Sequence, residues 1–380
     1  MTTSVAPGTT LTQYAELYRC AVTGRTDWLL LRLTDQDGAT GWGECSDAGP
    51  RAAVLRVLAG RAGGGGGGAD TVGEFTRRTV LGALRQALAD QAARRAGQPL
   101  WRWLAGAGAA EPSATAPSAG VPLVADLNRA PGGRAPRELA DTAAAAVRAG
   151  FTAVELAPFD APGGDRLADL GLARVRAVRS AVGPGVAVLV DCRERLSLAE
   201  LTPLLDPFAE LGVGWLADGV GIGRPAELAE LRRRTGLALA GGRTAASVGE
   251  LAAVDGLLDV LRPDVKHAGG PAAVLALAAA AGRARVSLHN PAGPVAALHS
   301  AHLAALLRAE SLGFAFGEVD WRAELLGGAE RIGEGRLVLP SGPGLGAEPD
   351  LRHRAVLPLW RGTVAVAESC CPPVPSRSAP

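Results

Sequence analysis

Short apolar runs alternate with longer stretches rich in alanine, leucine and arginine over the last two thirds of the chain. The runs recur at a spacing of roughly 25 to 35 residues, which is typical of repeated strand–helix units. Eight parallel strands followed by helices close into a barrel, so the pattern predicts an α/β fold of the barrel type. The predicted strands are residues 121–126, 153–157, 186–191, 214–217, 238–242, 258–264, 285–289 and 314–318.

The first third of the chain follows other patterns. Two extended apolar segments flank a turn-forming stretch, which predicts a hairpin over residues 28–44. Apolar residues then recur at spacings of three and four, which predicts a helix within residues 72–105. The six glycines from Gly63 to Gly68 predict a mobile loop, because such a run holds no single conformation at low cost.

Composition favours a soluble protein with a small-molecule partner. The 39 basic and 38 acidic residues leave a formal net charge of +1, so no overall field would attract nucleic acid or an anionic membrane. Residues 1–12 lack the features of a secretory leader, and no stretch resembles a membrane span. We therefore expect a cytoplasmic protein.

Cysteine and lysine usage narrows the candidate chemistry. The five cysteines are odd in number and show no CxxC spacing, which favours free thiols over a zinc site or a disulfide framework. Lys266 is the only lysine among the 39 basic residues, so at most one lysine can serve as a catalytic base.

An ordered set of short segments carries a family resemblance. The set includes residues 41–45, 90–101, 150–154, 190–192, 215–216, Pro263-Asp264-Val265-Lys266-His267-Ala268-Gly269-Gly270 and His289-Asn290-Pro291-Ala292-Gly293-Pro294. In this order and spacing the chain resembles the enolase superfamily, in its mandelate racemase/muconate lactonizing enzyme-like branch, which includes sugar-acid dehydratases. The resemblance implies a modified (β/α)7β TIM-type barrel with an N-terminal α+β capping domain. The domains it implies are a capping domain of residues 1–118 with a returning segment 341–368 and a barrel of residues 119–340. The cysteine- and proline-rich composition of residues 369–380 predicts a disordered tail.

Members of that family hold a divalent ion through carboxylates on the third, fourth and fifth barrel strands, and the resemblance finds only one of them here. Asp191 matches the third-strand ligand, but the other two positions fall on Ala217 and Arg243. Asp218 is expected to face away from the barrel mouth. The lysine pair of the second strand is also replaced, with Glu155 at its first position. Because magnesium requires several hard oxygen ligands, we expect no metal ion, and no other cofactor.

The acid–base half of the family's site is retained. An aspartate, a histidine and a glutamate on the sixth, seventh and eighth strands match Asp264, His289 and Glu318. An aspartate bonded to one imidazole nitrogen raises the basicity of the other, which suits proton transfer. The resemblance therefore implies that these three residues are catalytic. The alternatives are a pair kept for packing and, for Glu318, an ion pair with Arg322. The other histidines are interpreted as structural: His267, His299, His302 and His353.

Four further residues are expected to line the mouth and bind substrate: Arg243, Arg193, Glu155 and Asp191. One hypothesis places Arg243 in the space of the ion, paired with Asp191, with donors left for a substrate carboxylate. The alternative is that Arg243 only neutralises Asp191 in an inactive site. Glu155 is either a second base opposite His289 or a partner for Arg193.

These residues favour a metal-independent lyase or isomerase. The expected reaction is an elimination, a cyclisation or a double-bond isomerisation of a small, anionic organic acid, in a protein that forms homo-oligomers. Loss of the ion forfeits stabilisation of an enediolate, so the substrate proton should already be activated. The alternatives are a non-catalytic descendant that binds a ligand or is structural, and a magnesium-dependent sugar-acid dehydratase.

Overall fold

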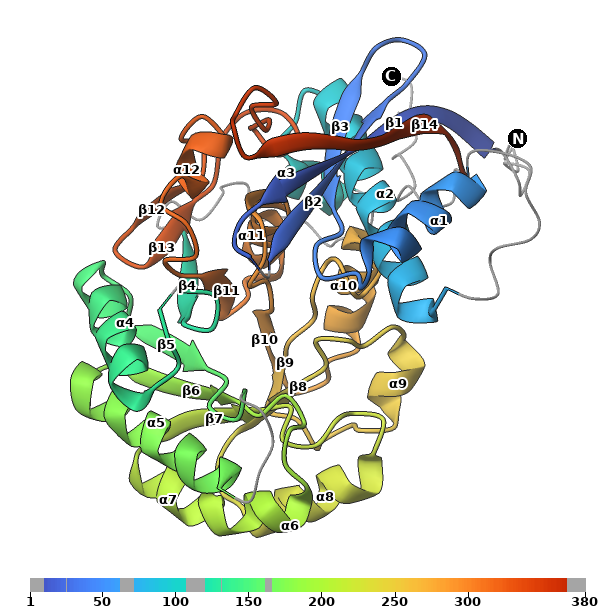
Figure 1. Ribbon diagram of the computed structural model, residues 1–380. Helices are drawn as coiled ribbons and strands as arrows, with labels where there is room; N and C mark the ends of the chain where they lie inside the picture. The colour runs from blue at the N-terminus through green and yellow to red at the C-terminus, as the bar shows by residue number, and fades with distance from the viewer. Residues whose placement is uncertain are drawn as a thin grey trace.

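The computed structural model describes residues 10–24, 26–61, 72–106, 120–130, 132–160 and 166–367. They form a parallel barrel and an antiparallel sheet domain that packs beside it (Figure 1). The run Gly63–Gly68, the expected domain boundary at residue 118 and the expected tail 369–380 lie outside the described residues.

Eight parallel strands form the barrel, and the pairing of β11 with β4 closes it. This confirms the predicted fold class. The strands read as nearly unbroken apolar runs because helices cover one face and the barrel interior covers the other. They are β4 (Val121–Asp126), β5 (Ala153–Leu156), β6 (Ala187–Asp191), β7 (Val213–Ala217), β8 (Leu239–Gly241), β9 (Val260–Leu261), β10 (Arg285–Leu288) and β11 (Ser311–Ala315).

The last strand differs from its prediction. It begins at Ser311, three residues before the predicted start at 314, and it ends at Ala315. Gly317 has a φ of +66°, a conformation that a strand does not contain. Glu318 therefore lies in the turn after β11 and not on the strand itself.

Helices surround the barrel and connect its strands (Figure 1). The longest ones pack apolar faces onto the outside of the strands. The helical segments of the barrel domain are α4 (Pro136–Arg148), α5 (Leu167–Val182), α6 (Leu198–Leu201), the 3-10 turn η2 (Thr202–Leu204), α7 (Leu205–Glu210), α8 (Pro225–Arg234), α9 (Val248–Ala252), α10 (Pro271–Ala279), α11 (Pro294–Leu307) and α12 (Arg322–Leu325). A short hairpin of β12 (Arg331–Gly333) and β13 (Arg336–Val338) pairs with β4.

The second sheet has the order β14-β1-β2-β3 and is antiparallel. Its last member in the chain, β14, pairs with β1 along the whole length of both strands, so the C-terminal segment returns to the N-terminal part of the fold. The strands and helices of this capping domain are β1 (Thr10–Ala21), β2 (Asp27–Thr34), β3 (Thr40–Glu44), β14 (Val356–Ala367), α1 (Arg51–Arg61), α2 (Glu74–Arg95) and α3 (Leu100–Gly106).

Two glycines let α2 lie directly on the sheet. A Cβ atom on Gly41 would lie 2.0 Å from the carbonyl oxygen of Ala87, and one on Gly43 would lie 2.0 Å from that of Ala83. Neither glycine lies in a turn. They lie within strand β3, and they are needed because the helix backbone approaches so closely.

Glu44 joins the capping domain to the barrel. From the end of β3, its carboxylate accepts hydrogen bonds from the backbone N–H groups of Gly293 and Ala296 at 2.8 and 2.9 Å, at the N-terminus of α11. Acceptor oxygens at a helix N-terminus are favourable, because the unpaired N–H groups point at them. This contact holds the capping domain over the end of β10, where His289 follows. No helix in the described part of the chain is long and apolar enough to cross a membrane.

Candidate functional site

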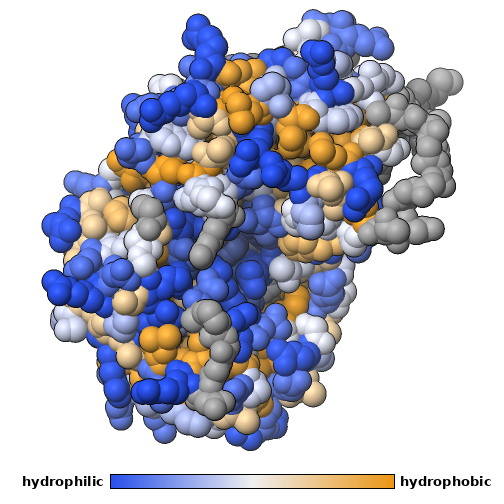
Figure 2. Space-filling model, in the orientation of Figure 1, coloured by the Kyte–Doolittle hydropathy of each residue, from blue (hydrophilic) through white to orange (hydrophobic). Residues whose placement is uncertain are grey.

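Ionisable residues gather at the carboxyl ends of the barrel strands. Asp126, Glu155 and Asp191 are the last or next-to-last residues of their strands, and Arg262 and His289 directly follow β9 and β10. All five are buried. Hydrophilic residues collect in a hollow between the capping domain and the barrel on the face that Figure 2 shows.

His289 and Asp264 are hydrogen-bonded, as their paired positions predicted. The imidazole Nδ1 lies 3.0 Å from Oδ2 of Asp264. Burial lowers the pKa of His289 to about 3, although the bond to Asp264 acts in the opposite direction. The ring is therefore neutral at pH 7. Among the described residues, none is hydrogen-bonded to its other nitrogen, Nε2.

Lys266 completes this buried cluster. Its ammonium lies 2.9 and 2.8 Å from the two carboxylate oxygens of Asp264 and 2.9 Å from Oδ1 of Asn290. Burial alone would raise the pKa of Asp264, but Lys266, His267 and His289 outweigh it and hold the pKa well below its usual value. Asp264 is thus ionised, and its carboxylate is hydrogen-bonded to both Lys266 and His289.

The partner of Asp191 is Arg193, so the predicted contact between Asp191 and Arg243 is wrong. Nε of Arg193 lies 3.3 Å from Oδ2 of Asp191, and the Arg193 backbone N–H donates to Oδ1 at 3.0 Å. Arg193 also reaches Asp160. Burial acts to raise the pKa of Asp191, but Arg193, Arg243 and Arg262 hold it below its usual value.

Arg243 is bonded to Asp218, at 2.5 Å between Nε and Oδ2. We had expected Asp218 to face away from the mouth, because its position alternates with that of the inward-facing Ala217. Its backbone has a φ of +45°, and its buried carboxylate lies next to Gly241 at the end of β8, which leaves that expectation a prediction. Arg243 therefore stays near the mouth with a different partner, and its charge still acts on Asp191 and His289.

Glu155 pairs with Arg262, which the sequence argument missed. Nη2 of Arg262 donates to Oε2 of Glu155 at 2.7 Å, and the indole N–H of Trp215 donates to Oε1 at 3.2 Å. The guanidinium also stacks on the Trp215 ring. The expected pairing of Glu155 with Arg193 is wrong. The period of two along the predicted strand 258–264 places Arg262 on the same face as Asp264, and that signal could have identified it.

The donor set does not fit the divalent ion of the family. At the three ligand positions only Asp191 offers oxygen, and Arg193 occupies both of its carboxylate oxygens. Ala217 belongs to the apolar cluster inside the barrel, and Arg243 is a cation. Within the described ranges, no group of three or more histidine, cysteine, aspartate or glutamate side chains is arranged to hold a metal ion.

Glu318 is buried and neither of its carboxylate oxygens has a hydrogen-bond partner. Burial raises the pKa of Glu318 to about 7, and the cations Arg129 and Arg322 limit the rise. The alternative of an ion pair with Arg322 is wrong, because Arg322 binds Glu330 through two nitrogens. A buried carboxyl group that titrates near neutral pH is suited to donating and accepting protons.

Most of the other histidines and cysteines have contacts that indicate a structural role. His299 bonds to the carbonyl of Trp42, and His302 contacts the backbone of Trp101 and Leu345. His267 is the exception, since both of its ring nitrogens are buried without a partner. Burial raises the pKa of the Cys45 thiol to about 12 and that of the Cys192 thiol well above its usual value, so neither is an activated thiolate.

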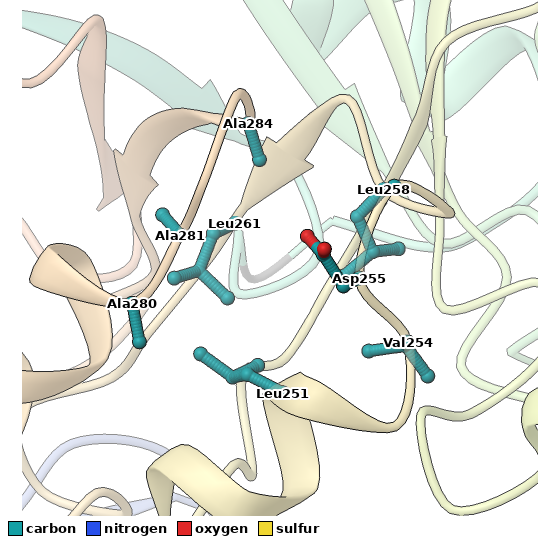
Figure 3. A pocket seen from close by; sticks show the side chains of 9 residues that line it. Leu251, Val254, Asp255, Leu258, Leu261, Ala280, Ala281 and Ala284 are labelled. Carbon is teal, nitrogen blue, oxygen red and sulfur yellow. The ribbon is translucent and has the colours of Figure 1, made fainter.

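A small cavity lies away from this cluster, between α9 and the end of α10 (Figure 3). Apolar side chains form most of its lining, among them Leu251, Val254, Leu258 and Leu261, and Asp255 is the one ionisable side chain among its lining residues. It contains no acid–base pair. The cluster at the barrel mouth, where His289 and Asp264 are hydrogen-bonded, is the candidate site.

Comparison with known proteins identifies the family of the barrel. A sequence model described as "Enolase C-terminal domain-like" matches residues 138–353, which is more than half of the chain. The matched region contains Glu155, Asp191, Asp264, His289 and Glu318.

One curated relative is named a dehydratase and another a member of a dehydratase family. A D-galactonate dehydratase from Verminephrobacter eiseniae is 28% identical over 307 residues, which cover 73% of this chain and 75% of the relative. A D-galactonate dehydratase family member from Streptomyces bingchenggensis is 27% identical over 372 residues, which cover 85% of this chain and 88% of the relative.

Solved structures share the fold. A mandelate racemase/muconate lactonizing enzyme-like protein from Rubrobacter xylanophilus superposes with a TM-score of 0.76 at 24% identity, covering 93% of this chain and 99% of that one. Another such protein, from Roseovarius sp. TM1035, superposes with a TM-score of 0.73 at 24% identity, covering 88% of this chain and 92% of that one.

Proposed function

We propose an acid–base function on the premise that the chain belongs to the enolase superfamily, in its mandelate racemase/muconate lactonizing enzyme-like branch. The proposed activity is that of a lyase or isomerase, by elimination, cyclisation or double-bond isomerisation of a small organic acid, without a divalent ion. The observation that carries it is the hydrogen bond between His289 and Asp264 beside ligand positions that hold Ala217 and Arg243.

His289 is the proposed base. An ionised aspartate only accepts hydrogen bonds, so Nδ1 of His289 carries the proton and Nε2 carries the lone pair. Because burial lowers the pKa of His289 to about 3, the imidazole is a weak base. A weak base suits a substrate whose proton is activated by a neighbouring group, and such a substrate would not depend on an ion that Ala217 and Arg243 are unable to ligate.

Glu318 is the proposed acid. In an elimination, Nε2 of His289 takes the proton from carbon, and the electron pair of that bond forms the double bond. The leaving hydroxyl group departs as water with the proton of Glu318, which the raised pKa keeps available near neutral pH. His289 then releases its proton and Glu318 gains one, which restores the starting state.

A magnesium-dependent sugar-acid dehydratase is the second candidate, and the names of the curated relatives favour it. It requires an ion at Asp191, where Arg193 occupies both oxygens. A non-catalytic descendant that binds a ligand is the third candidate, and the replaced ligand positions favour it. These candidates differ in two measurable properties, magnesium dependence and proton exchange.

The test follows hydrogen–deuterium exchange by NMR in heavy water, with a panel of sugar acids and of small acids that carry an activated proton. We expect exchange or turnover that is equal with excess magnesium and with chelator, and that His289→Asn abolishes. His353→Asn, a change outside the cluster, is the matched control and should retain activity. Magnesium-dependent turnover would support the dehydratase, and equal exchange in wild type and His289→Asn would remove His289 from the mechanism.

A further inference from the structure

We propose that Lys266 is a positioning residue that keeps His289 neutral by sharing the carboxylate of Asp264. This refines the proposed function and rests on it only for the role of His289, since the contacts themselves do not depend on any reaction. Lys266 is the only lysine in a chain whose other basic residues are all arginine, and its side chain is only 1% exposed.

The geometry of the shared carboxylate carries the inference. Oδ2 of Asp264 lies 2.8 Å from the Lys266 ammonium and 3.0 Å from Nδ1 of His289, so both residues use the same oxygen. Oδ1 accepts from the backbone N–H and the ammonium of Lys266, each at 2.9 Å. An ammonium group donates only, which leaves Asp264 as the acceptor for both partners.

Two effects follow from this arrangement. The ammonium keeps Asp264 ionised, so Asp264 fixes the tautomer of His289. It also neutralises the charge that would otherwise favour a protonated imidazole, because an unpaired carboxylate beside a histidine raises its pKa. Asn290 accepts the third bond of the ammonium at 2.9 Å and holds it in place.

Other groups around His289 contribute to its titration, but they stay unchanged when Lys266 is replaced. Arg262 and Arg243 act on it from the ends of β9 and β8, and it is electrostatically coupled to Asp191 at the end of β6. His267 lies 3.7 Å from the same oxygen of Asp264, and Glu318 follows the neighbouring strand β11. A difference between wild type and a Lys266 variant therefore reports on Lys266 alone.

The test measures the protonation of His289 directly by NMR of protein labelled with 13C at histidine Cε1, with the signal assigned by its loss in His289→Asn. We expect His289 to remain neutral between pH 5 and 8 in the wild type. In Lys266→Met its pKa should rise by roughly one to three units and bring its titration toward that window. In Asp264→Asn/Lys266→Met the signal should again be neutral throughout, because the unpaired carboxylate is gone.

Lys266→Gln is the second variant, which keeps a donor to Asp264 without the charge, in case methionine is not accommodated. Identical titration of His289 in wild type and in the folded variants would overturn the inference, as would a wild-type His289 that titrates near pH 6.5. The measurement needs no substrate. A shifted pKa together with unchanged proton exchange in His289→Asn would support the role of Lys266 and refute the catalytic role of His289.

Discussion

Arg262 and Glu155 form an ion pair inside the barrel, with side chains 2% and 1% exposed. Breaking such a pair leaves one charge without a partner in a medium that solvates it poorly, whereas replacing both partners removes the charges together. Because Arg262 also acts on Asp191 and His289, the pair belongs to the electrostatics of the mouth as well as to its packing.

We expect Arg262→Met to lower the free energy of unfolding by about 3 kcal/mol, because it leaves the buried Glu155 without a charged partner. Glu155→Gln/Arg262→Met should recover most of that loss, since glutamine still accepts from the Trp215 indole. Denaturant titration of the wild type, both single variants and the double variant measures the coupling. Additive losses in the double variant would mean that the pair is not coupled.

Glu318 should make the protein less stable as the pH rises. Its pKa is raised to about 7 in the folded state, so its contribution to stability is fully present below pH about 4.5 and is lost as the pH rises to about 7. We expect Glu318→Gln to be about 2 kcal/mol more stable than the wild type at pH 8 and nearly equal to it at pH 4. Denaturant titrations at both pH values check this. A constant difference at all pH values would contradict the buried, unpaired carboxyl group.

At the scale of elements, the contact between β3 and α2 depends on the missing side chain at Gly43. A methyl group there would lie 2.0 Å from the carbonyl oxygen of Ala83, and neither backbone can move without separating helix and sheet. We expect Gly43→Ala to destabilise the protein by about 3 kcal/mol. Gly60→Ala in α1 is the control, because nothing lies within 4 Å of its added Cβ and alanine favours a helix. Melting temperatures compare the two, and a Gly43→Ala variant as stable as Gly60→Ala would contradict the close packing.

Glu44 connects two further elements, since it extends from β3 to the N-terminus of α11. Glutamine has one acceptor oxygen, so it cannot accept from the N–H groups of Gly293 and Ala296 with two oxygens as the carboxyl group does. We expect Glu44→Gln to lower the free energy of unfolding by about 1 to 2 kcal/mol. Glu74→Gln, at an exposed position in the first turn of α2, is the control and should change stability much less. Equal effects in both variants would remove Glu44 as a link between the domains.

At the scale of the whole molecule, four buried neutral histidines make the fold sensitive to acid. Burial lowers the pKa to about 3 for His289 and His299 and to about 4 for His267 and His302. Unfolded histidine titrates near 6.5, so the unfolded chain binds more protons below that pH. The stability that these residues contribute is therefore present above pH 6.5 and is lost as the pH falls toward 4.

We expect the free energy of unfolding to fall by about 1 kcal/mol per pH unit for each of these histidines between pH 6 and pH 4.5. His302→Gln should show a shallower slope by one such contribution, because glutamine does not take up a proton. His353→Gln is the control, since its side chain lies outside this buried group. Denaturant titrations at several pH values give the slopes, and equal slopes for wild type and His302→Gln would contradict a buried, neutral His302.

The sequence pattern by itself determined the barrel and the hairpin, whereas the pairing of His289 with Asp264 was predicted from the resemblance to the enolase superfamily. The barrel and the hairpin depend on periodic apolar runs, which are local in the chain. A strand that is buried on both faces reads as an apolar run, and its last residue must lie at the barrel mouth.

Only the tertiary structure decided which acidic and basic side chains form ion pairs. Arg193 and Arg243 each had several carboxylates within reach along the sequence, and the choice depended on the left-handed turn at Asp218 and on the inward path of Arg262 from β9. The same holds for Gly43, whose role is set by a helix that begins 31 residues later, at Glu74. Pairing between side chains from different strands depends on distances of a few ångströms, and the spacing of residues along one strand does not fix those distances.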